Sequence, residues 1–189
     1  MKWILSMLCM FVFTSCAMLG TNLVHSPTAT EGTSWKNTHV HGGPTKKAPP
    51  DAIIFQIDDS TNVKVGARVI WEKKNFTGIL FPIFPIFWLP KTNYYKSEPN
   101  SLVIELTTIG SRVNLQVASA KILANGLSYE IESKRTKSFV VTELRFPVPA
   151  KHTPDFKLTN LSIVINDTTV VLPPITFRRM KQRWRFVGP

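Results

Sequence analysis

The chain has 189 residues, of which 43% are hydrophobic, and it carries two cysteines and a formal net charge of +11. This composition is that of a globular protein, and the length accommodates one domain with targeting or linker segments. Both cysteines, Cys9 and Cys16, lie near the N-terminus, so the rest of the chain can form neither a disulfide nor a zinc site built on thiolates. Residues 178–189 contribute +5 with no acidic residue, so nearly half of the charge excess lies in this short segment.

The first fifteen residues have the pattern of a signal peptide. Lys2 precedes an apolar run over residues 3–13, which is shorter than the roughly 20 residues of a membrane-spanning helix. The sequence FTSC at residues 13–16 then resembles the lipobox of bacterial prolipoproteins, in which the cysteine receives lipid. The resemblance covers only the first 17 residues. It implies acylation of Cys16 and, because Ala17 is not Asp, sorting to the outer membrane in a Gram-negative cell. An ordinary cleaved signal peptide and an uncleaved anchor are the alternatives.

Residues 16–50 are predicted to be a lipidated cysteine followed by a flexible linker. From Thr21 to Pro50 the chain is rich in Thr, Ser, Gly, Pro and Asn, and a tether of this kind would reach about 30 Å. Three of the four histidines fall here, and His39 and His41 with His25 could hold a divalent metal only weakly, because a disordered pair has no second shell. We therefore predict no metal site and no cofactor.

Residues 51–189 are predicted to form an antiparallel β-sandwich, for which an immunoglobulin-like topology is one arrangement. Short runs of β-type residues recur at the spacing typical of such folds, and no segment shows sustained helical periodicity. The predicted strands are Ala52–Ile57, Val63–Trp71, Leu102–Thr107, Val113–Leu123, Leu127–Glu132, Phe139–Phe146, Leu161–Ile165 and Thr168–Leu172.

Two hairpin turns, and the residue pairing that each of them sets, can be predicted from the sequence. Asn125-Gly126 is a strong two-residue hairpin signal that places Ile122 opposite Tyr129 and Lys121 opposite Glu130. The apolar positions change parity upstream of this hairpin, which predicts a β-bulge near Ala118-Ser119. Asn166-Asp167 predicts a second hairpin that pairs Ile165 with Thr168 and Ile163 with Val170.

Catalytic motifs are missing from the sequence. It contains no G-x-S-x-G, H-E-x-x-H, P-loop or paired C-x-x-C motif, and His152 lies alone in a proline-flanked loop. Triads that need histidine or cysteine therefore lack their parts, and we predict that the protein is not an enzyme. A hydrolase with an unrecognised pair of carboxylates stays as an alternative, although the adjacent Asp58-Asp59 resembles a turn.

The segment GILFPIFPIFWLP, residues 78–90, holds nine large apolar side chains and no charge. Its three prolines exclude a helix and a central strand, and exposing nine such side chains would forgo on the order of 15–20 kcal/mol. One interpretation is a loop that completes the core at an open end of the sandwich. The other is a partly exposed patch that contacts a partner or lipid. Extended backbone predicts a division between the two. The candidate contact residues are Phe81, Phe84, Phe87 and Trp88.

The C-terminal segment places four basic residues on one face when it is read as a strand. Such a face could bind lipopolysaccharide, anionic lipid or nucleic acid, and nucleic acid is the least expected partner of an exported protein. The alternative is a last edge strand whose charges prevent aggregation. The candidate anion-binding residues are Arg179, Lys181, Arg183 and Arg185.

Together these features predict a lipid-anchored protein of the bacterial envelope that acts as a non-catalytic binding or structural module. The expected partners are the membrane, through the anchor, and an envelope protein or anionic lipid. The sequence identifies no small-molecule substrate.

Overall fold

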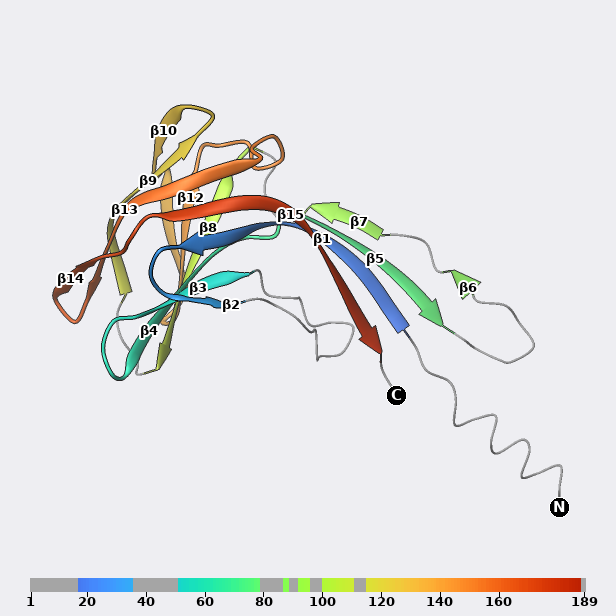
Figure 1. The fold of residues 1–189 in the computed structure, drawn as a ribbon, viewed down its shortest axis with the longest axis horizontal. Coiled ribbons are helices and arrows are strands. Elements are labelled where there is room, and N and C mark those ends of the chain that lie inside the picture. Colours follow the sequence, from blue (N-terminus) through green and yellow to red (C-terminus); the bar gives the residue numbers. More distant parts are fainter. Residues whose placement is uncertain are drawn as a thin grey trace, which may run out of the picture.

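The computed structural model describes residues 17–35, 51–78, 87–88, 92–95, 100–110 and 115–187, with side chains for 21–34, 51–71, 100–110 and 115–183. Every regular element in these ranges is a β-strand. The strands form two antiparallel sheets, so the predicted β-sandwich is confirmed (Figure 1). Among the described residues, no helix is long and apolar enough to span a bilayer.

The larger sheet has the strand order β10-β9-β13-β15-β1-β5-β6, with β14 paired to β13 and β7 paired to β5. Its two longest strands, β1 and β15, come from opposite ends of the chain and lie side by side in its middle. The bounds are β1 Ala17–Ala29, β5 Trp71–Gly78, β6 Phe87–Trp88, β7 Thr92–Tyr95, β9 Leu115–Ala124, β10 Leu127–Glu130, β13 Asp155–Ile165, β14 Thr168–Val171 and β15 Ile175–Val187.

The smaller sheet has the strand order β11-β12-β8-β4-β3-β2. Along part of β4 and β8, at residues 61–65 and 104–108, buried positions that face the core alternate with half-buried positions on the outer side, as expected when one face of a sheet is covered. The bounds are β2 Thr33–Trp35, β3 Ala52–Gln56, β4 Thr61–Ala67, β8 Leu102–Gly110, β11 Ser133–Ser138 and β12 Val141–Phe146.

A continuous apolar core lies between the sheets. Phe156 and Phe177, neighbours on β13 and β15, stack with ring centroids 4.7 Å apart. At about 2 kcal/mol for each large side chain, this burial is the main driving force for folding. Its fully buried members include Ile53, Val65, Ile104, Leu106, Leu144 and Phe146 from the smaller sheet, and Ile122, Leu158, Ile163, Ile175 and Phe177 from the larger one.

Both predicted hairpins are confirmed. Asn125 and Gly126 have positive φ angles of 52° and 76°, and Ile122 pairs with Tyr129 as the sequence indicates. A salt bridge of 2.9 Å joins Lys121 to Glu130 across the same hairpin. The turn at residues 166–167 likewise has positive φ at both positions, and it pairs β13 with β14 in the predicted register.

The predicted β-bulge is also confirmed. The register between β9 and β13 shifts between the pairs Ser119–Ser162 and Val117–Ile163, which leaves Ala118 as an extra residue on β9. Ala118 and Ser119 are both exposed, whereas Val117 and Ala120 are buried. The bulge therefore reconciles the two apolar parities of this strand.

The prediction of one strand over Val63–Trp71 is wrong. The chain leaves β4 after Ala67 and begins β5 at Trp71 in the other sheet. In the crossing, the N–H of Arg68 donates to Val103 O at 2.9 Å and the N–H of Ile70 donates to Leu23 O at 3.0 Å. An apolar run can thus cross between sheets because both layers contribute to one core.

The prediction of a flexible linker is wrong for residues 17–35, which contain β1 and β2. The segment is polar, but β1 is paired with β15 along its whole length and with β5 over residues 17–23, and β2 is paired with β3. Three of its positions, Asn22, Val24 and His25, are fully buried. Residues 36–50, including His39 and His41, lie outside the described residues.

Gly110, at the end of β8 in the smaller sheet, is predicted to be essential for packing. Gly126, which also has positive φ, serves as the control. Gly110 has φ of 117°, and a Cβ there would overlap the carbonyl oxygen of Ser60. Gly126 has φ of 76° in a turn where a Cβ would meet no atom within 4 Å. We expect Gly110→Ala to lower the free energy of unfolding by about 3 kcal/mol or more, because strain and overlap add. The control Gly126→Ala should lower it by about 1 kcal/mol. Urea denaturation measures both, and equal losses would contradict this account.

Candidate functional site

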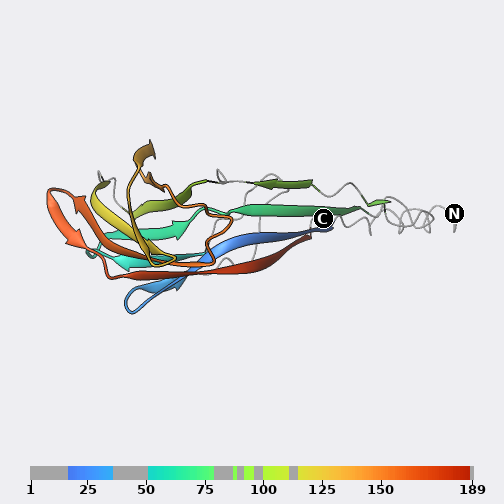
Figure 2. The same cartoon turned by 90° about the horizontal axis from the view of Figure 1, so that it is seen from above.

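The larger sheet continues beyond the sandwich as a ribbon, seen in both views (Figure 1, Figure 2). We use this name for residues 17–23 of β1, all of β5, β6 and β7, and residues 181–187 of β15. β1 is its middle strand, with Ala17 opposite Thr77 on one side and Val187 on the other. Six steps of about 3.4 Å separate the level of Leu23 from that of Ala17, so the ribbon is about 20 Å long.

A buried carboxylate ties the base of the ribbon to the smaller sheet. Asp51, which directly precedes β3, is 4% exposed. Its Oδ2 accepts a hydrogen bond from Ser26 Oγ at 2.9 Å, and its Oδ1 accepts one from Gln182 Nε2 at 3.0 Å. One side chain therefore joins β1, β15 and the start of β3. Since breaking a buried charged hydrogen bond is costly, these three elements are held in one arrangement.

His25 occupies a fully buried position on β1. Its Nε2 lies 2.9 Å from Thr153 O, and because a carbonyl can only accept, Nε2 carries the proton. The ring also meets Phe156 edge to face at 4.9 Å. Burial lowers the pKa of His25 from its usual 6.5, and the nearby Arg179 charge lowers it further, while the hydrogen bond to Thr153 and the Asp155 charge oppose the shift. His25 is therefore a neutral structural residue at neutral pH.

The structure places part of the apolar segment at the far end of the ribbon. Phe87 and Trp88 form β6, where Phe87 pairs with Gly78 and Trp88 with Thr77. Thr77 in turn pairs with Ala17, the residue after the predicted lipidation site. Phe81, Phe84 and Cys16 lie outside the described residues.

The four predicted anion-binding residues all lie on β15. Arg179, Lys181 and Arg183 are exposed, and Arg185 lies opposite Leu19 of β1. The N–H of Arg179 donates to Pro154 O at 2.9 Å and its Nη1 donates to Lys151 O at 2.8 Å, so this residue secures the loop before β13.

β15 is not the last edge strand that the alternative interpretation assumed. It pairs with β1 along its whole length and with β13 from Ile175 to Arg178. In the part of the chain that the structure describes, no strand pairs with the β13 side of β15 beyond Arg178. β15 is thus central in the sandwich and at an edge only within the ribbon.

Two carboxylates face one another on the outer side of the smaller sheet. Glu105 and Glu143 are paired positions on β8 and β12. Arg68 Nε lies 3.0 Å from Glu105 Oε1, and Glu143 forms ion pairs with both Arg68 and Lys137. This cluster has the form of a structural ion network, because each carboxylate is bound by a cation.

The predicted turn at Asp58-Asp59 is confirmed. Asp58 Oδ1 accepts hydrogen bonds from the N–H of Ser60 at 2.8 Å and from its hydroxyl at 2.9 Å. These hydrogen bonds, from the backbone first and then from the side chain, lower the pKa of Asp58. Its carboxylate thus stabilises the turn between β3 and β4.

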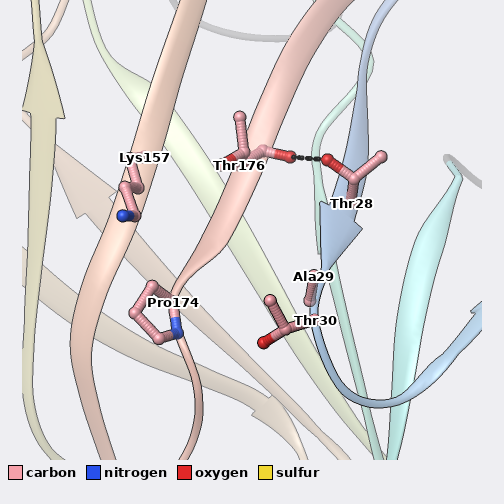
Figure 3. A pocket seen from close by; sticks show the side chains of 6 residues that line it. All are labelled: Thr28, Ala29, Thr30, Lys157, Pro174 and Thr176. Carbon is pink, nitrogen blue, oxygen red and sulfur yellow. Dashed lines mark hydrogen bonds between the residues drawn. The ribbon is translucent and has the colours of Figure 1, made fainter.

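An open pocket of about 380 Å³ lies where β1, β13 and β15 meet, at the end away from the ribbon (Figure 3). Thr28 Oγ1 donates to Thr176 O across it at 3.3 Å, and Lys157 is its one charged lining residue. The lining includes no carboxylate, histidine or cysteine. Among the described residues no group of three His, Cys, Asp or Glu side chains is placed to hold a metal ion.

Sequence reasoning missed Asp51, Ser26 and Gln182, which join the base of the ribbon to the smaller sheet, and the structural role of the buried His25. Their signal was weak because the polar residues around β1 follow the composition of a linker. Comparisons with protein-family models, with curated proteins and with solved structures find no match to this chain.

The buried His25 predicts that stability depends on pH. Well above pH 6.5 the His25 ring is neutral in the folded and in the unfolded chain, so the protonation of His25 costs no stability there. As pH falls through 6.5 the unfolded chain binds a proton that the folded chain, with its lowered pKa, does not. The free energy of unfolding should therefore fall as pH is lowered from about 6.5.

Urea denaturation between about pH 7.5 and pH 5.5 measures this effect. His25→Gln should flatten the dependence on pH over that interval. The exposed His152, changed to Gln in the same way, supplies the matched control. Equal flattening in both variants would rule out His25 as the cause.

Proposed function

We propose that the protein is a lipid-anchored component of the bacterial envelope, attached through Cys16, that serves as a non-catalytic binding or structural module. In a Gram-negative cell its membrane would be the outer membrane. The signal-peptide pattern and the lipobox at residues 13–16 support the anchor. The non-catalytic role is supported by the described side chains after Ala17, because they form a sandwich core and a structural ion network.

The observation that carries this proposal is the position of β1. Its first residue, Ala17, directly follows Cys16, and the strand then runs without a break into the buried core at Val24 and His25. An anchor at Cys16 would therefore be joined to the sandwich by a paired strand, about 20 Å long, and not by a mobile tether. Such a connection suits a protein that must hold a domain at a set height above a lipid surface.

A hydrolase is the less favoured candidate. Its support would be Glu105 and Glu143, paired on adjacent strands. Arg68 binds both, however, so neither carboxylate is left free to face a substrate. The pocket beside Thr176 lies on the other sheet and has no carboxylate in its lining.

The anchor is tested by Cys16→Ser in cells. The wild-type protein should stay with membranes in salt of about 1 M, where electrostatic contacts are screened within about 3 Å. The variant should either appear in the soluble fraction under this wash or remain an unprocessed precursor. Intact mass of the purified wild type should show acyl chains on Cys16, and an unmodified N-terminus would overturn the lipoprotein assignment.

A further inference from the structure

The backbone register sorts the ribbon into levels, each made of residues that oppose one another on neighbouring strands. The last levels carry no charged residue. Met18 opposes Phe76 and Phe186, and Ala17 opposes Thr77 and Val187. β6 adds two aromatic residues at this end, with Trp88 opposite Thr77 and Phe87 opposite Gly78. The eight residues that join Gly78 to Phe87 are also uncharged in the sequence.

The next levels toward the sandwich are basic. Arg185 lies at the level of Leu19, Lys74 at the level of Gly20, and Lys73 and Arg183 both at the level of Thr21. Lys181 follows at the level of Leu23, and Glu72, at the level of Asn22, is the one acidic residue among the described ribbon positions. The ribbon therefore changes along its axis from an uncharged aromatic end to a basic belt. We define this belt as Lys73, Lys74, Lys181, Arg183 and Arg185.

The dimensions of this pattern match the surface of a bilayer. At about 3.4 Å per residue, the levels of Arg185, Lys74 and Arg183 lie roughly 7, 10 and 14 Å from the level of Ala17. Amphipathic helices that lie in the membrane interface bury their apolar face by about 5–10 Å, which gives a scale for shallow insertion. With its end at that depth, the ribbon would hold Arg185, Lys74 and Arg183 near the lipid phosphates, with Lys181 farther from the membrane. Tryptophan and basic residues at that depth are typical of membrane-contacting segments.

We propose that the end of this ribbon is a membrane-binding site for an anionic phospholipid bilayer, with the uncharged levels among the headgroups and the belt against the phosphates. This inference rests on the proposed anchor for its location, since Cys16 directly precedes the last level. It adds a second attachment that does not need the acyl chains. An acidic protein is the less favoured partner, because the uncharged aromatic levels beyond the belt would then have no role.

The binding test uses the unlipidated chain from Ala17 onward, which contains every described residue, so that its outcome is independent of acylation. Four tryptophans remain in this chain, and Trp88 lies at the ribbon end whereas Trp35 lies on β2 in the other sheet. Variants that keep only one of these two, with the others changed to Phe, are mixed with phosphatidylglycerol vesicles and with phosphatidylcholine vesicles. The emission of the Trp88 variant should shift to the blue with phosphatidylglycerol, and that of the Trp35 variant should not change.

Charge variants test the belt. Each basic residue near an anionic surface contributes about fivefold to the partition coefficient, so Arg183→Gln with Arg185→Gln should weaken binding about 30-fold. The matched control is Arg135→Gln with Lys157→Gln, which removes two exposed basic residues from the sandwich and should change binding less than about twofold. Circular dichroism and urea denaturation confirm that each pair of changes leaves the fold intact.

Three results would overturn the proposal. The first is an unchanged Trp88 spectrum on adding phosphatidylglycerol vesicles. The second is equal weakening by the belt pair and the control pair, which would mean that net charge alone causes binding. The third is binding to lipopolysaccharide micelles or to an acidic polypeptide without binding to the vesicles, which would assign the belt to another partner. Each of these can occur while Cys16 is still acylated, so the anchor and the ribbon end are tested separately.

Discussion

The pairing of β1 with β15 is the interaction on which the rest of the structure depends. It runs in unbroken register from Ala17 opposite Val187 to Ala29 opposite Ile175. Half of that length lies in the sandwich and half in the ribbon, so the same ladder builds both parts. β5 is added only on the other side of β1, over residues 17–23. Without β1, the second half of β15 would lose the partner that it has among the described strands, and β5 would keep only the short strands β6 and β7.

The polar residues of β1 and its neighbours specify this pairing. A slip of one residue in a β-ladder moves each side chain to the other face of the sheet. Such a slip would separate His25 from Thr153 O and Ser26 from Asp51, leaving buried polar groups without hydrogen bonds. Apolar side chains alone would tolerate the change better, since their contacts have little directionality. Asp51 therefore contributes to register as much as to stability.

The sequence predicted the parts of the fold that depend on local chemistry. Asn125-Gly126 determines its hairpin because both residues tolerate positive φ, and the parity change at Ala118 requires an extra residue whatever the surrounding fold. The sequence did not predict β1, because a polar strand buried by distant partners has the same composition as a linker. His25 is the clearest case, since its partner Thr153 is 128 positions away. The run through residue 71 was misassigned for a related reason: apolar periodicity does not record which sheet a strand joins.

The candidate site shows the same division between local and distant information. The proposed lipobox, the apolar segment and the basic segment are each visible in the sequence, but nothing local indicates that they belong together. The register joins them, because Ala17 opposes both Thr77 and Val187, and Thr77 also opposes Trp88. A flexible linker after Cys16 would let the domain sample every orientation within about 30 Å of the anchor. A paired ribbon restricts that freedom, so the proposed anchor and ribbon end would together fix which face of the sandwich points away from the membrane. That restriction would lower the entropy lost when a partner binds the outward face, which is the advantage a structural or binding module would draw from a strand in place of a tether.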